Sequence, residues 1–311
     1  MSEKTGLIFD IRKDSYQDGP GNRTVVLFKG CSLYCWWCED PETQSPVIEV
    51  HVTKTRCIQC GTCIRICPMD AVDFEQDLEN KTAIVIDRDV CIACGACLEA
   101  CPGNARALTG TQMTVAEVMR QIEAGRVNYM QSGGGVTFGG GEPLIQNQFL
   151  EELLHLCRQS GISTAVSTSV YAPWEIIDRL RSEIDLFLCE IKFIDDVRHT
   201  HFTGLSNELI LENLKHLDHL GHPIILRVPL IPGTNDDEIN LRAIARFASE
   251  LHCLQGVDLL FYRQIAEDRF VRLGKPYLVK ENHPFSEEQV HNTIRIFEEF
   301  GLPIHVADLQ V

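Results

Sequence analysis

The chain has 311 residues, of which 44% are hydrophobic and 23% charged, a composition ordinary for a globular protein with a sizeable core. Its formal net charge is −16 and it has no long run of Lys or Arg, which argues against binding to nucleic acid or to an anionic membrane surface. It has no stretch of about 18 apolar residues that would predict a spanning helix, and Met1–Lys4 lacks the apolar region of a secretory signal, so we expect a cytoplasmic protein.

Cysteine is the unusual feature of the composition. The chain has 14 cysteines, and 11 of them lie between Cys31 and Cys101. A secreted disulfide scaffold of this density would be short and would carry a signal peptide. Neither condition is met, so we predict reduced thiolates that bind metal.

The first candidate metal site follows a predicted strand, Thr24–Lys29. Cys31, Cys35 and Cys38 form a C-x3-C-x2-C motif, and no fourth cysteine follows before the repeat that begins at Cys57. Three thiolate ligands on a four-iron cluster leave one iron free to bind a substrate, as the open coordination position does in other catalytic metal sites. The alternative is a structural site completed by a remote cysteine: Cys157, Cys189 or Cys253.

Residues 51–106 contain a twofold repeat of C-x2-C-x2-C-x3-C-P. In such a repeat, three close thiolates bind one cluster and the fourth reaches the other. Two four-cysteine zinc sites are the alternative, but zinc sites usually pair two separated C-x2-C units. We favour electron transfer for these clusters over a purely structural role. One 4Fe–4S cluster is expected on Cys57, Cys60, Cys63 and Cys101, and the other on Cys91, Cys94, Cys97 and Cys67.

The rest of the chain alternates apolar strands with amphipathic helices, and several helices end at a glycine that a strand follows at once. This order predicts parallel strands with right-handed crossovers, in an open or closed α/β barrel whose site lies at the carboxyl ends of the strands. We divide the chain into a barrel, residues 1–50 and 107–311, and a small ferredoxin-like α+β insert, residues 51–106. The predicted strands are Thr24–Lys29, Gly135–Phe138, Ser163–Ser167, Asp185–Ile191, Ile224–Val228, Val257–Phe261 and Leu302–Val306, and the predicted helices include Gln148–Gln159, Glu208–Leu220 and Glu287–Phe300.

Several motifs carry a resemblance to known enzymes. The C-x3-C-x2-C motif, with the aromatic Trp37 before its last cysteine, resembles the radical S-adenosylmethionine (SAM) superfamily. The resemblance is closer still to the activating enzymes of glycyl-radical enzymes, whose larger members carry a ferredoxin insert at the same place. The matching motifs are Asp18–Thr24 (DGPGNRT), Phe28–Cys31 (FKGC), Pro41–Glu42, Val136–Pro143 (VTFGGGEP) and Arg227–Asp236 (RVPLIPGTND).

The resemblance implies a partial (β/α) TIM-like barrel of the radical SAM type, with SAM and three 4Fe–4S clusters as cofactors. The implied activity is reductive cleavage of SAM to a 5′-deoxyadenosyl radical, which takes hydrogen from a glycine of a partner glycyl-radical enzyme. It also implies an electron donor such as flavodoxin or ferredoxin, and an anaerobic setting. Two alternatives stay open: a radical enzyme that acts directly on a small molecule or peptide, and an electron-transfer protein.

The resemblance also assigns site residues in the barrel. Trp37 would lie near the adenine of SAM, and the turn Gly140–Glu142 would receive the methionine amino group, with glycines where the backbone approaches the ligand. Lys192 and Arg227 would hold the methionine carboxylate. The expected SAM-binding residues are Trp37, Gly140, Gly141, Glu142, Glu190, Lys192 and Arg227, and the catalytic set is Cys31, Cys35, Cys38, Lys192 and Arg227.

The sequence departs from the family where SAM or the partner is expected to bind. Gly139 stands where Ser is usual, Ser167 where Glu is common, Glu190 where Asp is usual and Arg263 where His is usual. Glu39-Asp40 also stands where Asn often precedes the proline. Because the cysteines and the Gly-Gly-Glu turn are intact, we predict that SAM binding is kept and that partner recognition is unusual.

Overall fold

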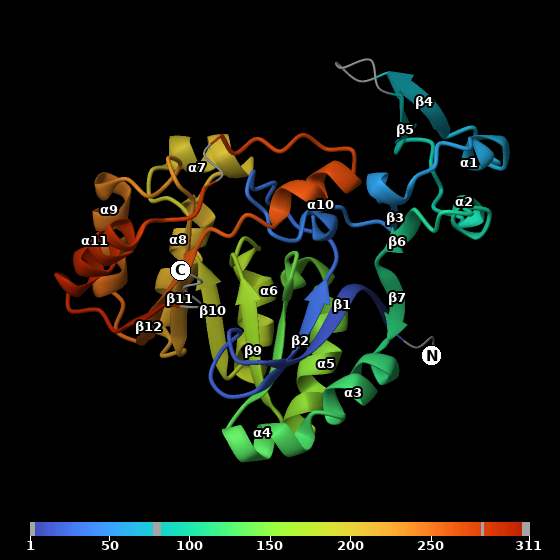
Figure 1. The fold of residues 1–311 in the computed structure, drawn as a ribbon. Coiled ribbons are helices and arrows are strands. Elements are labelled where there is room, and N and C mark those ends of the chain that lie inside the picture. The colour runs from blue at the N-terminus through green and yellow to red at the C-terminus, as the bar shows by residue number, and fades with distance from the viewer. Residues whose placement is uncertain (1–3, 77–81, 281–282, 307–311) are drawn as a thin grey trace.

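The computed structural model describes residues 4–76, 82–280 and 283–306 (Figure 1). Met1–Glu3, on which the expected absence of a secretory signal partly rests, lie outside these ranges. Within them, no helix combines the length and the apolar character that crossing a bilayer requires.

The core of the fold is a nine-stranded sheet in the order β13-β12-β11-β10-β9-β8-β2-β1-β7. From β2 to β13 every neighbouring pair is parallel. In the described part of the chain the two edge strands do not pair with each other, so the barrel is open, and the predicted partial barrel is confirmed. The parallel strands are β2 (Arg23–Phe28), β8 (Gly135–Gly140), β9 (Ser163–Thr168), β10 (Leu186–Glu190), β11 (Ile224–Leu230), β12 (Leu254–Phe261) and β13 (Ile304–Val306).

Strands β1 (Thr5–Ser15) and β7 (Thr111–Thr114) extend one edge of the sheet and were not predicted. Both run antiparallel to their neighbours, with Ile8 opposite Phe28 in β2 and also opposite Thr111 in β7. Most of β1 is partly or fully exposed. The charged second half of β1 is therefore kept extended by pairing with β2, rather than by an apolar repeat, whereas the first half pairs on both sides.

Helices cover the outer face of the sheet, and their apolar side chains form one large core with the strands. Two of the helices begin with a capping box, formed by Thr114 with Glu117 and by Ser286 with Gln289. The helices are α3 (Val115–Glu123), α4 (Arg126–Ser132), α5 (Asn147–Gln159), α6 (Trp174–Leu180), α7 (Asp196–Thr203), α8 (Glu208–His219), α9 (Glu238–Ser249), α10 (Ala266–Arg272) and α11 (Glu287–Glu298), with 3-10 turns η1 (Pro41–Thr43), η3 (Pro143–Gln146) and η4 (Arg181–Glu183).

The cysteine-rich insert projects from the barrel on the side to which the strand arrows point (Figure 1). It leaves and re-enters the barrel through a two-stranded sheet of β3 (Glu49–Val52) and β6 (Arg106–Thr109), in which Val52 lies opposite Arg106. Beyond this pair lie η2 (Lys54–Arg56), α1 (Thr62–Arg65), β4 (Val72–Gln76), β5 (Thr82–Ile86) and α2 (Ala96–Glu99). The small sheet straddles the predicted boundaries at residues 51 and 106, and the division into two domains stays a prediction.

Candidate functional site

The carboxyl ends of the parallel strands surround a cavity of about 280 Å³. Three thiols line it, and within the described ranges none of the remote cysteines Cys157, Cys189 and Cys253 does. This arrangement does not support a fourth cysteine ligand for the first cluster. Every barrel residue that the sequence assigned to the site lines this one cavity: Cys31, Cys35, Trp37, Cys38, Gly140, Gly141, Glu142, Glu190, Lys192 and Arg227.

Backbone hydrogen bonds fix the cysteine loop that follows β2. The amide of Cys31 donates to the carbonyl of Gln44 at 3.0 Å, and the Gln44 side chain donates to the carbonyl of Cys35 at 3.2 Å. On the other side, the amide of Trp36 donates to the carbonyl of Phe202 in α7 at 3.2 Å. Trp37 is buried and packs beside Phe202, with a ring centroid distance of 6.2 Å. Hydrogen bonds therefore hold the loop on one side to the segment after η1 and on the other side to helix α7.

The three thiols of this loop lie in an environment that suits iron. Burial raises the pKa of the Cys31 thiol to about 12, and burial also raises the pKa values of Cys35 and Cys38. Lys192 lowers the pKa of Cys35, but burial is the larger effect, whereas a bound metal centre supplies the further positive charge that takes a thiolate. Three soft sulfur donors around one cavity thus fit a 4Fe–4S cluster.

The Gly-Gly-Glu turn after β8 is joined directly to the cysteine loop. The amide of Glu142 donates to the carbonyl of Gly30 at 2.7 Å. A Cβ on Gly141 would lie 2.1 Å from that same carbonyl oxygen, and one on Gly140, whose φ is +99°, would lie 2.7 Å from the backbone nitrogen of Phe28. We expected these glycines to make room for a ligand. The structure adds a second reason, the close approach of the neighbouring backbone, and the role of these glycines toward a ligand stays a prediction.

Glu142 is fully buried, and burial raises its pKa although several hydrogen bonds oppose the shift. Its Oε1 accepts from Thr168 Oγ1 at 2.6 Å and from the amide of Leu144 at 3.2 Å. Its Oε2 accepts from the hydroxyl and the amide of Ser169, at 2.6 and 2.9 Å. A carboxylate has about four acceptor sites, and all are used here. If Glu142 contacts the amino group of SAM as predicted, that amino group must share an acceptor site of the carboxylate with one of these four donors.

Lys192 and Glu190 form a buried ion pair in the cavity. Lys192 Nζ lies 2.9 Å from Glu190 Oε2. Burial lowers the pKa of Lys192, but Glu190 and Cys35 raise it more, so the net direction is upward. Lys192 in turn lowers the pKa of Glu190. The lysine is therefore held as a cation beside the cysteine loop, which is the state that binds a carboxylate.

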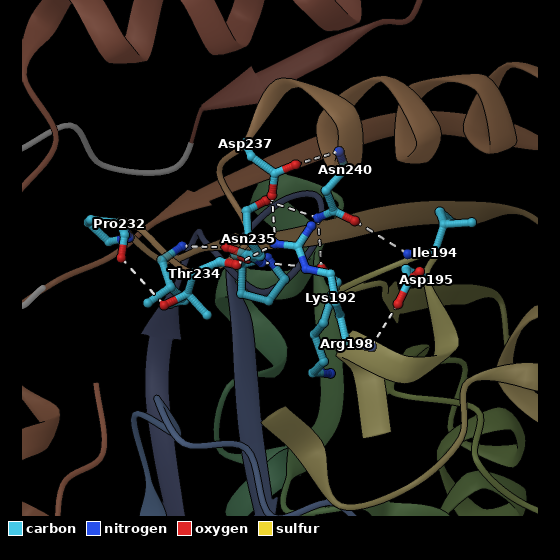
Figure 2. A network of polar contacts seen from close by, with 11 residues as sticks. Lys192, Ile194, Asp195, Arg198, Pro232, Thr234, Asn235, Asp237 and Asn240 are labelled. Carbon is cyan, nitrogen blue, oxygen red and sulfur yellow. Dashed lines mark hydrogen bonds and ion pairs between the residues drawn. The ribbon is translucent and has the colours of Figure 1, made fainter. Parts of the chain in front are cut away.

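A web of amide side chains fixes the backbone that carries Lys192 (Figure 2). The Nδ2 groups of Asn235 and Asn240 donate to the carbonyl of Lys192 at 3.3 and 3.2 Å. Asn240 Oδ1 accepts from the amide of Ile194 at 3.4 Å. Arg198 in α7 ties the same region to the start of α9 through Asp237, at 2.6 Å. Sequence reasoning missed Asn240, because nothing in its local pattern indicates a contact with a residue 48 positions earlier.

Arg227 lies in β11 with Glu190 and Asp258 as its direct neighbours in the flanking strands. It is largely buried, and its Nη1 lies 3.6 Å from Asp18 Oδ1. Its Nε, 3.8 Å from Asp258, has no hydrogen-bond partner among the described residues. A guanidinium that lines the cavity and keeps an unused donor fits a planar anionic ligand such as a carboxylate.

Four of the positions at which the sequence is expected to depart from the family fall into two groups beside the cavity. A Cβ on Gly139 would lie 3.2 Å from the Cβ of Ser167, whose hydroxyl accepts from Arg227 at 3.4 Å. Arg263 and Glu39 form an ion pair at 3.1 Å, with both side chains nearly half exposed. All four residues line the cavity. The departures therefore form one group at its floor and one at its rim.

The insert brings cysteines of both repeat copies together. A second, small pocket is lined by apolar side chains and by the four cysteines predicted for one cluster, Cys67, Cys91, Cys94 and Cys97. In each copy the fourth cysteine accepts a backbone amide at 3.3 Å, from Ala71 to Cys67 and from Ala105 to Cys101. Such N–H···S bonds are characteristic of the surroundings of iron–sulfur clusters. The two ligand sets remain predictions.

Comparison with known proteins agrees with these features. Residues 91–243 match the radical SAM superfamily, and residues 56–105 match the 4Fe-4S dicluster domain. The chain therefore has a radical SAM unit, which implies SAM and a 4Fe–4S cluster, and a dicluster unit in place of the zinc alternative.

Several similar proteins are named activating enzymes. The trans-4-hydroxy-L-proline dehydratase activating enzyme of Clostridioides difficile is 41% identical over 94% of this chain and 96% of its own length. The choline trimethylamine-lyase activating enzyme of Oleidesulfovibrio alaskensis is 37% identical over 98% and 99%. Among solved structures, a domain of the pyruvate-formate lyase-activating enzyme of Bacteroides vulgatus covers 56% of this chain and 99% of that one, with 33% identity and a TM-score of 0.49. The chain therefore belongs to the activating enzymes of glycyl-radical enzymes within the radical SAM superfamily, which cleave SAM reductively to place a radical on a partner enzyme.

Proposed function

We propose that the protein holds three 4Fe–4S clusters and uses the one on Cys31, Cys35 and Cys38 to cleave SAM within the barrel cavity. The observation that carries the proposal is that these thiols share one cavity with the Gly-Gly-Glu turn and with two basic side chains. A cofactor bound there would meet sulfur, backbone and cationic groups at the same time. When bound, the cluster supplies the electron that breaks a carbon–sulfur bond of the SAM sulfonium.

The side chains of the barrel have separate tasks in this proposal. Lys192, held cationic by Glu190, and Arg227, with its unused Nε, bind the methionine carboxylate. Buried Trp37 gives the adenine an apolar wall next to the cysteine loop. Glu142 braces the Gly-Gly turn against β9 through Thr168 and Ser169. These contacts orient SAM and exclude water, and the cofactors carry the difficult chemistry.

We also propose that the substrate of the radical is a backbone glycine in a loop of a partner glycyl-radical enzyme. The relatives named above are activating enzymes for a dehydratase and for a lyase, so the family supports a protein partner rather than a small molecule. A low-potential donor such as flavodoxin or ferredoxin supplies electrons, and the dicluster insert is their entry point. The purely electron-transferring alternative has no support among these relatives.

The first test is release of 5′-deoxyadenosine by the anaerobically reconstituted protein, given SAM and a strong reductant. We expect release by the wild-type chain, none by Cys35→Ala, and unchanged release by Cys253→Ala, a half-buried cysteine outside the cavity. No release from wild-type protein with its full iron content would contradict the proposal. The partner is then tested by the appearance of a glycyl-radical signal when a candidate partner enzyme is added.

A further inference from the structure

One arginine in the insert contacts cysteines that belong to the two different predicted clusters. Arg106, the first residue of β6, is 7% exposed. Its Nη2 donates to Cys63 Sγ at 3.1 Å. Arg106 is also close enough to Cys97 to oppose the rise in pKa that burial of that thiol causes. The two predicted clusters of the insert are called the auxiliary clusters here. Cys63 is a predicted ligand of one and Cys97 of the other, so the guanidinium lies between the two cluster sites.

Among the residues that the structure describes, no carboxylate provides this buried cation with a counter-charge. Within the described ranges, Arg106 forms no ion pair with a carboxylate, and its Nη1 has no hydrogen-bond partner. A buried charge is costly unless a group of opposite charge is close to it. Four thiolates around an iron–sulfur core carry a net negative charge that would provide this partner. The position of Arg106 is therefore accounted for by clusters on the predicted cysteines.

The internal repeat shows that the position itself does not demand a cation. Arg106 follows the fourth cysteine of the second copy by five residues, and Val72 follows the fourth cysteine of the first copy by five. Both are buried and both begin a strand. An apolar side chain is thus sufficient at this position of the fold. The arginine is a feature of one copy only, which points to a role beyond packing.

We propose that Arg106 raises the reduction potentials of the two auxiliary clusters by stabilising their reduced state. A cluster that takes one electron from a low-potential one-electron donor gains one negative charge, and no bond or proton is exchanged. A cation within hydrogen-bond distance of a ligand sulfur favours that more negative state. Because Arg106 is buried, solvent and salt screen the effect weakly. The inference rests on the cluster assignment of the proposed function.

The test compares potentials of the full-length, anaerobically reconstituted protein and its variants. Each protein is titrated with a titanium(III) reductant while the EPR signals of the reduced clusters are recorded, with and without SAM, which identifies the SAM-binding cluster. Arg106→Met removes the charge, Arg106→Lys keeps it, and Lys54→Met removes an exposed charge from the same insert. At a fixed solution potential, we expect Arg106→Met to lower the ratio of reduced to oxidised auxiliary cluster at least tenfold, a shift of about 59 mV. Arg106→Lys should retain most of the wild-type ratio, and Lys54→Met should match the wild type.

Each outcome decides the proposal. Unchanged potentials in Arg106→Met protein with full iron would overturn it, and so would equal shifts in Arg106→Met and Arg106→Lys. If Arg106→Met does not retain its iron, Arg106→Gln takes its place, and loss of iron from both would replace the proposal with a structural role. Wild-type protein without the auxiliary iron would instead contradict the cluster assignment itself, so the two failures are distinguishable.

Discussion

Arg263 donates a hydrogen bond of 3.1 Å to the carboxylate of Glu39 at the rim of the cavity, and both residues stand where the family usually has others. An exposed pair of this kind contributes at most about 1 kcal/mol to stability. The position of the pair matters more, because in the proposed function a loop of the partner passes the rim to reach the cysteine loop.

We expect Arg263→Gln and Glu39→Gln to change the KM for the partner enzyme severalfold, since rim charges act mainly on association. The release of 5′-deoxyadenosine without partner should stay constant. The double variant should show a coupling between the two sites, measured in a double-mutant cycle. If SAM cleavage without the partner fell as much as activation of the partner did, the ion pair would contribute to cofactor binding instead of partner binding.

Gly140→Ala should be much more damaging than Gly133→Ala. Both glycines have a positive φ, +99° and +71°, but a Cβ on Gly133 meets open space, whereas one on Gly140 meets the backbone of β2. The conformational cost alone is about 1–2 kcal/mol, and overpacking adds about 1–3 kcal/mol at Gly140. Urea denaturation of the two variants measures the difference. Equal losses would show that the turn shifts freely away from the cysteine loop.

Asn240→Ala should weaken both the fold and the binding of SAM. The change removes a buried donor from the carbonyls of Lys192 and Asn235 and an acceptor from the amide of Ile194. Unsatisfied buried groups of this kind cost about 1–3 kcal/mol, measurable by urea denaturation, and calorimetry should show weaker SAM binding. Asn292→Ala, on the exposed face of α11, is the control and should change stability by less than about 0.5 kcal/mol. Unaltered SAM affinity in Asn240→Ala would show that the hydrogen bonds of Asn240 do not position Lys192 for SAM binding.

The stability of the protein should fall as the pH drops below about 6.5, because His199 in α7 is buried and burial lowers its pKa. Its Nδ1 lies 2.7 Å from the carbonyl oxygen of Leu205. Above the unfolded pKa both states are neutral; below it the unfolded chain takes up a proton that the folded chain resists, at a cost of up to about 1.4 kcal/mol per pH unit.

The unfolding midpoint at pH 7.5 and at pH 5.5 measures this effect. His199→Gln should flatten the dependence, whereas His291→Gln, on an exposed face, should leave it unchanged. If the unfolding midpoint of His199→Gln depended on pH as steeply as that of the wild type, other titrating groups would be the cause.

Most of the parallel strands were predictable because each is a short apolar run before or after an amphipathic helix, and β2 was predictable as an apolar run before the cysteine motif. Strand β1 was not, because its residues from Asp10 onward are mostly polar and exposed, and they are extended through pairing with β2. The local pattern of apolar and polar residues indicates which residues are buried. It does not indicate a strand such as β1, which depends on hydrogen bonds to segments that are distant in the sequence.

The cavity residues were predictable for a related reason. The thiols, the Gly-Gly-Glu turn and the basic residues fall within contiguous motifs, and the fold brings those motifs to one end of the sheet. The supporting contacts were not predictable. The contacts of Ser169 with Glu142, of Asn240 with the carbonyl of Lys192 and of Arg106 with Cys63 each join separate segments, and only the folded chain specifies such pairs.

The antiparallel pairing of Val52 with Arg106 has a consequence for how this protein arose. Cα atoms that face each other in such a ladder are about 5 Å apart, so the whole dicluster unit enters and leaves the barrel at nearly one point. A gene segment that encodes it could be gained, lost or exchanged without moving either neighbouring strand. The barrel and the dicluster insert can therefore evolve as separate modules, so that one changes while the other is conserved.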